Sequence, residues 1–138
     1  MNKYISISED SPLILASKSP RRKNLLKQVG IPFRSLPSNI EENAICGLPS
    51  HMAERLAGEK ASAALKKIQG SWILGVDTIV VLGDRILGKP TNADNAREML
   101  KILSGKDHEV ITGYSVLNPS CQRSFKSIPI SVVKSIPL

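Results

Sequence analysis

The sequence predicts an α/β fold with a mixed sheet flanked by helices, and two observations indicate it. Short apolar runs typical of strands alternate with segments whose apolar residues recur at helical spacing. Glycine and proline stand at the junctions between these segments. The chain has 138 residues, 41% of them hydrophobic and 22% charged, which suits one domain with its own core. We therefore expect a single domain over residues 1–138.

The first half of the chain predicts two strands and two helices. The apolar run Leu13–Ala16 indicates a short buried strand. A helix is expected over Pro20–Val29, since Ser19 suits its N-cap and Gly30 suits the position just past its end. Its inner face is expected to carry Leu25, Leu26 and Val29. An extended stretch over residues 31–36, an open loop over 37–48 and a longer helix over 49–68 follow.

The second half predicts a hairpin, one helix and two further strands. Strands are expected over residues 72–82, 85–87, 109–117 and 123–133, the last interrupted at Pro129, and a helix over 93–103. Gly83 and Asp84 suit a two-residue hairpin turn with glycine first. Asn92 or Thr91 suits the N-cap of the helix, and Gly105 suits the position past its end. The residues expected on its inner face are Ala96, Met99, Leu100 and Leu103.

The segment from Ser17 to Lys23 predicts a binding site for phosphate. Its sequence is Ser-Lys-Ser-Pro-Arg-Arg-Lys, and it lies at the expected junction of a strand and a helix. Free backbone N–H groups and the positive end of the helix dipole would face an anion bound there. Arg21 and Arg22 could each donate two hydrogen bonds to phosphate oxygens. The alternative is a solvated basic first turn, although cations at that end oppose the helix dipole.

Asp77 interrupts the otherwise apolar strand Ile73–Val81. A carboxylate is costly to bury unless it is paired with a cation or bound to a metal. A metal ligand or a general base would therefore suit this position. The alternative is a strand-end acid whose oxygens accept hydrogen bonds from backbone N–H groups. Thr78 adds a hydroxyl beside it, although strands favour threonine in any case.

Three further positions carry groups that suit the same chemistry. Lys89 lies in a Gly-Lys-Pro turn that would hold it in place, and Lys60 lies on the inner edge of the longer helix. The pair Glu41-Glu42 in the open loop could bind a divalent metal. Each is also compatible with an ordinary solvated residue. Together with Asp77 and the cationic segment they indicate phosphoryl chemistry, in which cations neutralise phosphate oxygens and a carboxylate positions or deprotonates water.

The composition and the motifs limit which other functions the chain could have. The net charge of +7 is compatible with polyanions, but aromatics are only 4% and are not interleaved with basic residues, so no specific nucleic acid is expected. Neither a P-loop nor a dinucleotide-binding glycine motif is present. Residues 1–10 lack the apolar core of a signal peptide, and no apolar run could span a membrane. Cys46 and Cys121 fit no metal or redox spacing, which suggests reduced cysteines in the cytosol.

Four motifs in these regions resemble those of the Maf family of nucleoside triphosphate pyrophosphatases. In chain order they are Leu13–Arg22, Gly75–Val81, Ile86–Pro90 and Leu103–Gly113. The resemblance implies a Maf/ITPase-like fold and hydrolysis of nucleoside triphosphates to the monophosphate and pyrophosphate. It further implies a divalent metal (Mg²⁺ or Mn²⁺), a cytoplasmic location, modified nucleotides among the substrates and, commonly, a homodimer. Family members have also been linked to arrest of septum formation.

The resemblance implies a role for individual residues at matching positions. Asp77 would accept the proton of the attacking water. Glu42 and Asp77 would hold the metal, while Lys60 and Lys89 would stabilise developing charge. Substrate binding would fall to Ser17, Ser19, Arg21, Arg22 and Thr78. The combination of Arg22 and Thr78 resembles the branch of the family that prefers dTTP and UTP.

The resemblance does not extend to the family's C-terminal segment. Family members continue with a Gly- and Gln-containing loop that completes the nucleotide pocket, so we expect the C-terminal part of the family fold to be missing and the domain to be incomplete. Two alternatives to an enzyme therefore stay open. One is a non-catalytic nucleotide-binding or cell-division-regulating protein with an incomplete site. The other is a basic module that binds nucleic acid.

Overall fold

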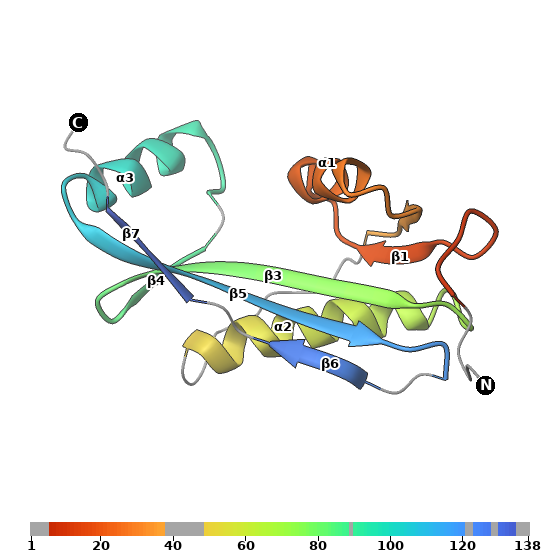
Figure 1. Cartoon of the computed structure of the whole chain (residues 1–138). Coiled ribbons are helices and arrows are strands. Elements are labelled where there is room, and N and C mark those ends of the chain that lie inside the picture. Colours follow the sequence, from red (N-terminus) through yellow and green to blue (C-terminus); the bar gives the residue numbers. More distant parts are fainter. Residues whose placement is uncertain (1–5, 38–48, 89, 121–122, 128–129, 135–138) are drawn as a thin grey trace.

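Figure 1 shows the protein as a computed structural model, in which residues 6–37, 49–88, 90–120, 123–127 and 130–134 are described. The elements are β1 (Leu13–Ala16), α1 (Pro20–Gln28), β2 (Phe33–Ser35), α2 (Pro49–Leu65), β3 (Ile73–Leu82), β4 (Arg85–Leu87), α3 (Ala93–Leu103), β5 (Asp107–Leu117), β6 (Arg123–Ser127) and β7 (Ile130–Lys134). The expected alternation of strands and helices is confirmed, and most boundaries agree within three residues.

All the strands belong to one mixed sheet. Its order is β2-β1-β3-β5-β6, with β4 also paired to β3 and β7 also paired to β5. Strand β1 runs parallel to β2 and β3. Strands β3 and β5 form a long antiparallel pair across the middle of the molecule in Figure 1.

The β3 strand has a gap along one edge. Strand β1 pairs with Ile73–Gly75 and β4 pairs with Val80–Leu82. Both must lie on the same edge, because β5 occupies the other edge from Ile73 to Val81. Among the described residues, no strand pairs with residues 76–79 on the β1 and β4 side. This gap opens at the end of β1, which is where the cationic segment begins.

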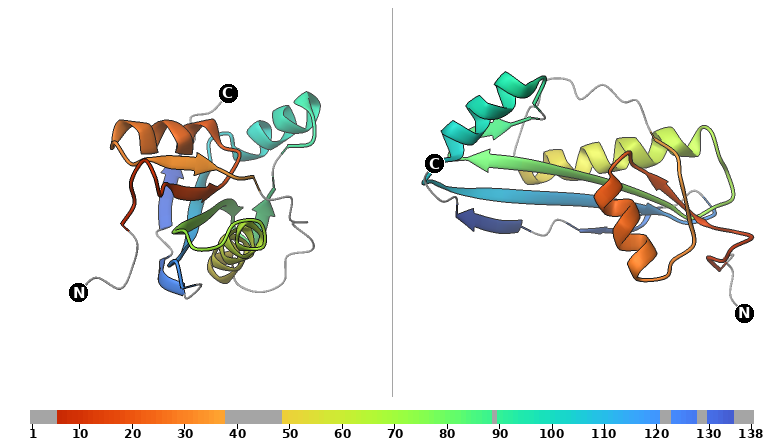
Figure 2. Two further views of the ribbon diagram at one scale, coloured as in Figure 1. Left: turned by 90° about the vertical axis from the view of Figure 1, so that its right-hand side faces the viewer. Right: turned by 90° about the horizontal axis from the view of Figure 1, so that it is seen from above.

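Helix α2 covers one face of the sheet, and α1 and α3 lie on the other side, toward its two ends (Figure 2). Apolar residues of α2 and of the facing strands make two clusters: Ile14, Ala16, Ala61, Ala64, Ile73 and Leu117 in one, and Met52, Ala53, Leu56, Ile79, Val81 and Ile111 in the other. The apolar residues of α2 therefore face the sheet.

Both ends of α1 form as the sequence predicts. The Ser19 side chain caps the helix by accepting a hydrogen bond from the Arg22 N–H at 3.4 Å. Gly30 follows the helix with φ +74°, and the N–H groups of Gly30 and Ile31 donate to the carbonyls of Lys27 and Leu26. This pattern is the glycine-dependent Schellman ending. The start of α1 is thus held at a defined place beside the end of β1.

The inner faces expected for α1 and α3 are wrong in part. Leu25 and Val29 are 54% and 67% exposed, and so is Leu100 on α3 at 57%. Neither helix contains a fully buried residue. Helices α1 and α3 make few contacts with the other described elements. The helical periodicity therefore identified an apolar side on each helix, but no described element covers it.

Within the described ranges, no helix has the length and apolarity to cross a membrane.

Candidate active site

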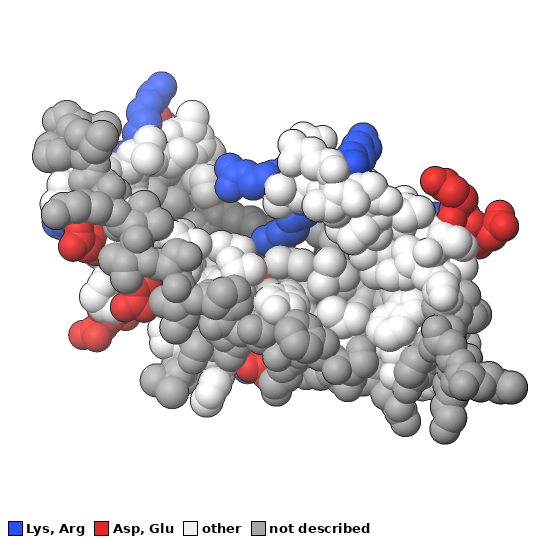
Figure 3. All heavy atoms as spheres, in the orientation of Figure 1, with Lys and Arg blue, Asp and Glu red and all other residues white. Residues whose placement is uncertain are grey.

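The molecular surface is hollowed between α1 and α3, and cationic side chains extend into this hollow from the α1 side (Figure 3). The hollow lies above β3 on the side of the sheet opposite α2. It therefore coincides with the edge gap in β3 and with the start of α1. Residues from α1, β3, β5 and the turn after β1 meet here, and Lys60 of α2 lies across β3 from them.

Ser17 lies directly after β1 and is buried, with 6% of its surface exposed. Its Oγ accepts hydrogen bonds from the Ser19 N–H at 3.1 Å and from Arg22 Nη1 at 3.2 Å. The Ser35 hydroxyl of β2 donates a hydrogen bond to the Ser17 carbonyl at 2.8 Å and so stabilises the turn after β1. A hydroxyl oxygen has two lone pairs, and these two hydrogen bonds occupy both of them. The Ser17 hydroxyl can therefore bind a ligand only as a hydrogen-bond donor.

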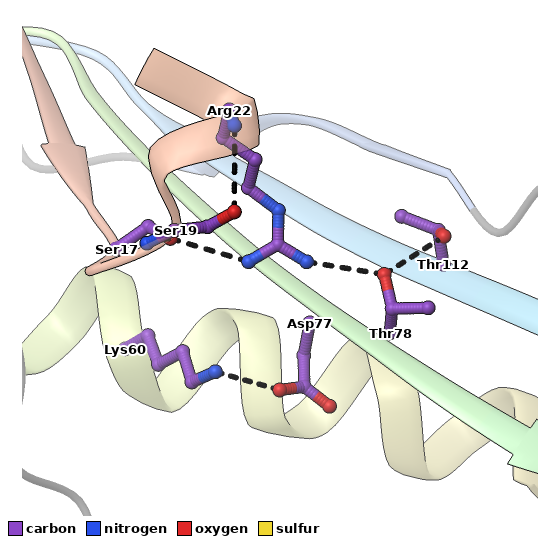
Figure 4. Close-up of polar contacts among 7 residues, drawn as sticks. All are labelled: Ser17, Ser19, Arg22, Lys60, Asp77, Thr78 and Thr112. Carbon is purple, nitrogen blue, oxygen red and sulfur yellow. Dashed lines mark hydrogen bonds and ion pairs between the residues drawn. The ribbon is translucent and has the colours of Figure 1, made fainter. Parts of the chain in front are cut away.

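Arg22 joins the turn after β1 to the middle of β3 (Figure 4). Its Nη1 donates to Ser17, and its Nη2 donates to Thr78 Oγ1 at 3.1 Å. Burial lowers the pKa of Arg22 from its ordinary value; nearby Asp77 opposes that shift and Arg21 adds to it. Arginine nevertheless stays protonated in proteins. Arg22 is thus a cation held between the turn after β1 and the middle of β3.

Arg21 has a different environment from its neighbour. It is exposed, and within the described part of the chain it makes no hydrogen bond or ion pair. Holding its side chain against a ligand would therefore cost entropy that Arg22 has already lost on folding. The two arginines of the motif are consequently not equivalent: one is preorganised and the other is free to close onto a ligand.

Lys60 and Asp77 form a buried ion pair on the other side of β3 (Figure 4). Lys60 Nζ lies 2.6 Å from Asp77 Oδ1, and the two side chains are 10% and 4% exposed. Lys60 comes from α2, so the pair joins the helix to the sheet. The cost of burying the Asp77 carboxylate is therefore offset by a cation rather than by backbone N–H groups alone.

Two glycines allow α2 to approach the sheet beside this pair. Gly113 lies directly opposite Asp77 on β5, and Gly75 lies two residues before it on β3. A Cβ atom at Gly75 would overlap the carbonyl oxygen of Ala57, and one at Gly113 would come within 2.5 Å of the Ala53 carbonyl oxygen. The short helix-to-sheet distance that lets Lys60 reach Asp77 thus depends on both glycines.

Asp77 and Thr78 are consecutive on β3 and so point to opposite faces of the sheet. The structure therefore places the Lys60–Asp77 pair on the α2 side and the Arg22–Thr78 contact on the hollow side. Asp77 is still close enough to act electrostatically on Arg22. The site crosses the sheet at the edge gap, with Lys60 and Arg22 on the two sides of the Asp77 carboxylate.

Two predicted site residues, Lys89 and Glu42, lie outside the described residues. In the described ranges, no group of three or more His, Cys, Asp or Glu side chains could hold a metal ion. Asp77 supplies a carboxylate of the type that Mg²⁺ prefers, and the second expected ligand is Glu42. The described residues thus provide one member of the expected pair.

Two hydroxyls at the site were not predicted from the sequence. Ser35 supports the turn after β1, and Thr112 Oγ1 lies 3.0 Å from Thr78 Oγ1. Finding Thr112 would have required the register of β3 against β5, in which Thr78 and Thr112 are directly opposite. That register is a long-range property, because α3 separates the two strands in the chain.

The fold and the site together define an α/β protein with a cationic hollow beside a buried carboxylate, an arrangement suited to a phosphorylated ligand. Residues 12–135 match the model of the family described as Maf-like protein, and the chain belongs to this family. The resemblance seen in the four motifs is therefore confirmed.

Curated relatives are similar over most of this chain. The chain is 53% identical over 108 residues to a dTTP/UTP pyrophosphatase of Ruminiclostridium cellulolyticum, covering 77% of this chain and 56% of that protein. It is 50% identical over 111 residues to a dTTP/UTP pyrophosphatase of Desulforamulus reducens, covering 79% of this chain and 58% of that protein. The matched part thus spans less than two thirds of each relative.

A solved structure supports the fold. The crystal structure of a nucleoside-triphosphatase / dITP/XTP pyrophosphatase from Mycobacterium abscessus superimposes with a TM-score of 0.56 at 15% identity. The match covers 89% of this chain and 73% of that chain. At this identity the likeness concerns the fold, and it confirms the expected ITPase-like α/β architecture.

Proposed function

We propose that the protein is a nucleoside triphosphate pyrophosphatase that acts on dTTP, UTP or modified nucleotides. The products would be the nucleoside monophosphate and pyrophosphate. The observation that carries the proposal is the position of Asp77, a buried carboxylate paired with Lys60 and within electrostatic reach of Arg22 at the edge gap. The relatives named dTTP/UTP pyrophosphatase, at up to 53% identity, support it.

In this proposal the start of α1 binds the triphosphate. The Ser17 hydroxyl has its acceptor sites filled and donates to a phosphate oxygen. Arg22 offers its remaining N–H groups from a fixed position, and Arg21 closes from the surface. Ser19 maintains the turn by capping α1. The helix N-terminus adds its partial positive charge.

The reaction is hydrolysis by in-line attack of water on the α-phosphorus. The water oxygen forms a bond to that phosphorus, its proton passes to the Asp77 carboxylate, and the bond to the oxygen bridging to the β-phosphorus breaks. Pyrophosphate leaves with the bridging oxygen. Lys60 and Lys89 stabilise charge as it develops, which is the main contribution a protein makes to phosphoryl transfer.

We extend the proposal to a divalent metal, with Glu42 and Asp77 as ligands and Mg²⁺ or Mn²⁺ as the ion. When bound, such an ion would neutralise charge on the phosphate oxygens. Removal of divalent ions with EDTA should abolish turnover, and return of either ion should restore it. A cytoplasmic location and a homodimer belong to the same proposal. So does a preference for dTTP and UTP, which the combination of Arg22 and Thr78 would provide.

The test is incubation of the full chain with dTTP, UTP, CTP, ATP and a modified pyrimidine triphosphate, with Mg²⁺ or Mn²⁺ present. Release of equal amounts of monophosphate and pyrophosphate from dTTP and UTP is the expected result. In ¹⁸O-labelled water the label should enter the monophosphate, because water attacks the α-phosphorus. Label in pyrophosphate, or release of single phosphates, would contradict the proposal. Binding without release would favour the non-catalytic alternative.

A further inference from the structure

Two threonine hydroxyls from neighbouring strands face each other beside Arg22 (Figure 4). Thr78 on β3 and Thr112 on β5 are directly opposite in the antiparallel ladder, and their Oγ1 atoms lie 3.0 Å apart. Thr78 Oγ1 also accepts the hydrogen bond from Arg22 Nη2 at 3.1 Å. The contacts therefore form a continuous chain from Ser17 through Arg22 and Thr78 to Thr112.

The chemistry of the groups fixes part of this chain. A guanidinium only donates hydrogen bonds, so Thr78 must be the acceptor in its contact with Arg22. Between Thr78 and Thr112, only one of the two hydroxyl hydrogens can occupy the contact. The other hydrogen is free for a ligand acceptor. The pair thus holds Arg22 and still presents one donor at the hollow.

The contact with Thr112 selects the side-chain rotamer of Thr78. A threonine Oγ1 occupies one of a few staggered positions around χ1, and in a strand no helical neighbour restricts the choice. In the observed rotamer, Thr78 Oγ1 meets Thr112 and Arg22 at the same time. Because Thr78 is exposed on its own strand, the cross-strand partner is what biases it toward this rotamer.

We propose that Thr112 is a positioning residue of the active site, which holds Arg22 in its substrate-binding orientation through the hydroxyl of Thr78. Two of the five guanidinium N–H groups are used in the bonds to Ser17 and Thr78, one from each terminal nitrogen. These two bonds fix the plane of the guanidinium. Three donors are left for phosphate oxygens at a preset angle. The inference rests on the proposed function for its effect on catalysis but not for the contact itself.

The catalytic test compares Thr112→Val with Thr112→Ser in the full chain. Valine keeps the shape of threonine and removes the hydroxyl, so we expect kcat/KM for dTTP to fall about fivefold, as for loss of one net hydrogen bond. Serine should restore most of it. In a Thr78→Val background, Thr112→Val should have no further effect, because its partner is already absent. Equal additional losses in both backgrounds would overturn the proposal.

Ser115→Ala is the matched control on the same strand. Ser115 is fully buried on the α2 side of β5, and among the residues that the structure describes its hydroxyl has no hydrogen-bond partner. Its removal should leave kcat/KM unchanged. If Ser115→Ala lowered kcat/KM as much as Thr112→Val does, general damage to β5 would explain both effects. That result would overturn the proposal.

A second measurement does not depend on activity. The ¹⁵Nε order parameter of Arg22, measured by NMR without nucleotide, should fall in Thr112→Val and stay at the wild-type value in Thr112→Ser and Ser115→Ala. An unchanged order parameter in Thr112→Val would overturn the positioning role. If the wild-type chain releases no pyrophosphate but Arg22 loosens as expected, the proposed function fails and the role of Thr112 in holding Arg22 stands.

Discussion

Replacing Lys60 with methionine should destabilise the protein strongly, because it leaves the Asp77 carboxylate buried without its cation. The two side chains are 10% and 4% exposed and their charged atoms lie 2.6 Å apart, so little solvent screening reduces the effect. Removing one partner of a buried pair typically costs ~3–5 kcal/mol. At roughly 4 °C per kcal/mol for a domain of this size, the melting temperature should fall by about 12 °C or more.

The same helix provides a matched control. Arg55 and Glu59 form an ion pair one turn apart on α2 at 3.6 Å, but their side chains are 53% and 46% exposed. Arg55→Met breaks that pair and adds a similar apolar side chain. Exposed pairs contribute ~0–1 kcal/mol, so the control should lower the melting temperature by only a few degrees.

The double variant Lys60→Met/Asp77→Asn separates the lost attraction from the unpaired charge. Asparagine removes the charge that methionine leaves uncompensated, so the double variant should be more stable than the sum of the two single changes predicts. We expect a coupling of about 2 kcal/mol, measured by urea unfolding. A Lys60→Met variant as stable as Arg55→Met, or strictly additive losses, would show that Lys60 and Asp77 do not depend on each other as a buried pair.

Three further outcomes follow from the described contacts. Gly113→Ala should cost about 1–3 kcal/mol or more in unfolding free energy, because its Cβ would overlap the α2 backbone, whereas Gly88→Ala, with nothing within 4 Å, should be neutral. Asn92→Ala should cost about 1 kcal/mol by removing the α3 cap, in which Asn92 accepts from the N–H of Asn95 at 2.8 Å; an unchanged urea midpoint would contradict that role. Ser19→Ala should cost less than Asn92→Ala, because its capping bond is longer at 3.4 Å, and the reverse order in unfolding experiments would count against the argument.

Local signals predicted the elements well. The strand Leu13–Ala16, the N-cap Ser19 and the terminal glycine Gly30 all agree with the structure, because each depends on residues adjacent in the chain. The inner face of α1 was wrong at Leu25 because amphipathic spacing does not say what covers a helix. Burial depends on which elements pack together, and that is decided by the whole fold.

The site was predictable where a residue conflicts with its surroundings. Asp77 was identified because a carboxylate in an apolar strand requires a partner that offsets the cost of its burial. In the structure, this partner is Lys60. Thr112 could not be identified in this way, since threonine is ordinary in a strand and its importance arises from its partner across the ladder. Arg22 was predicted as a phosphate ligand, but its fixed orientation depends on Thr78, which only the tertiary structure brings close.

If Asp77 activates the attacking water, removal of its charge should stop turnover while the cations still bind the triphosphate. The most direct measurement compares the full chain with its Asp77→Asn variant, following pyrophosphate release from dTTP and dTTP binding under the same conditions. Loss of a general base should lower kcat on the order of 10²–10⁴-fold, with the dissociation constant for dTTP changed little. Wild-type turnover in the Asp77→Asn variant would show that Asp77 is not the general base.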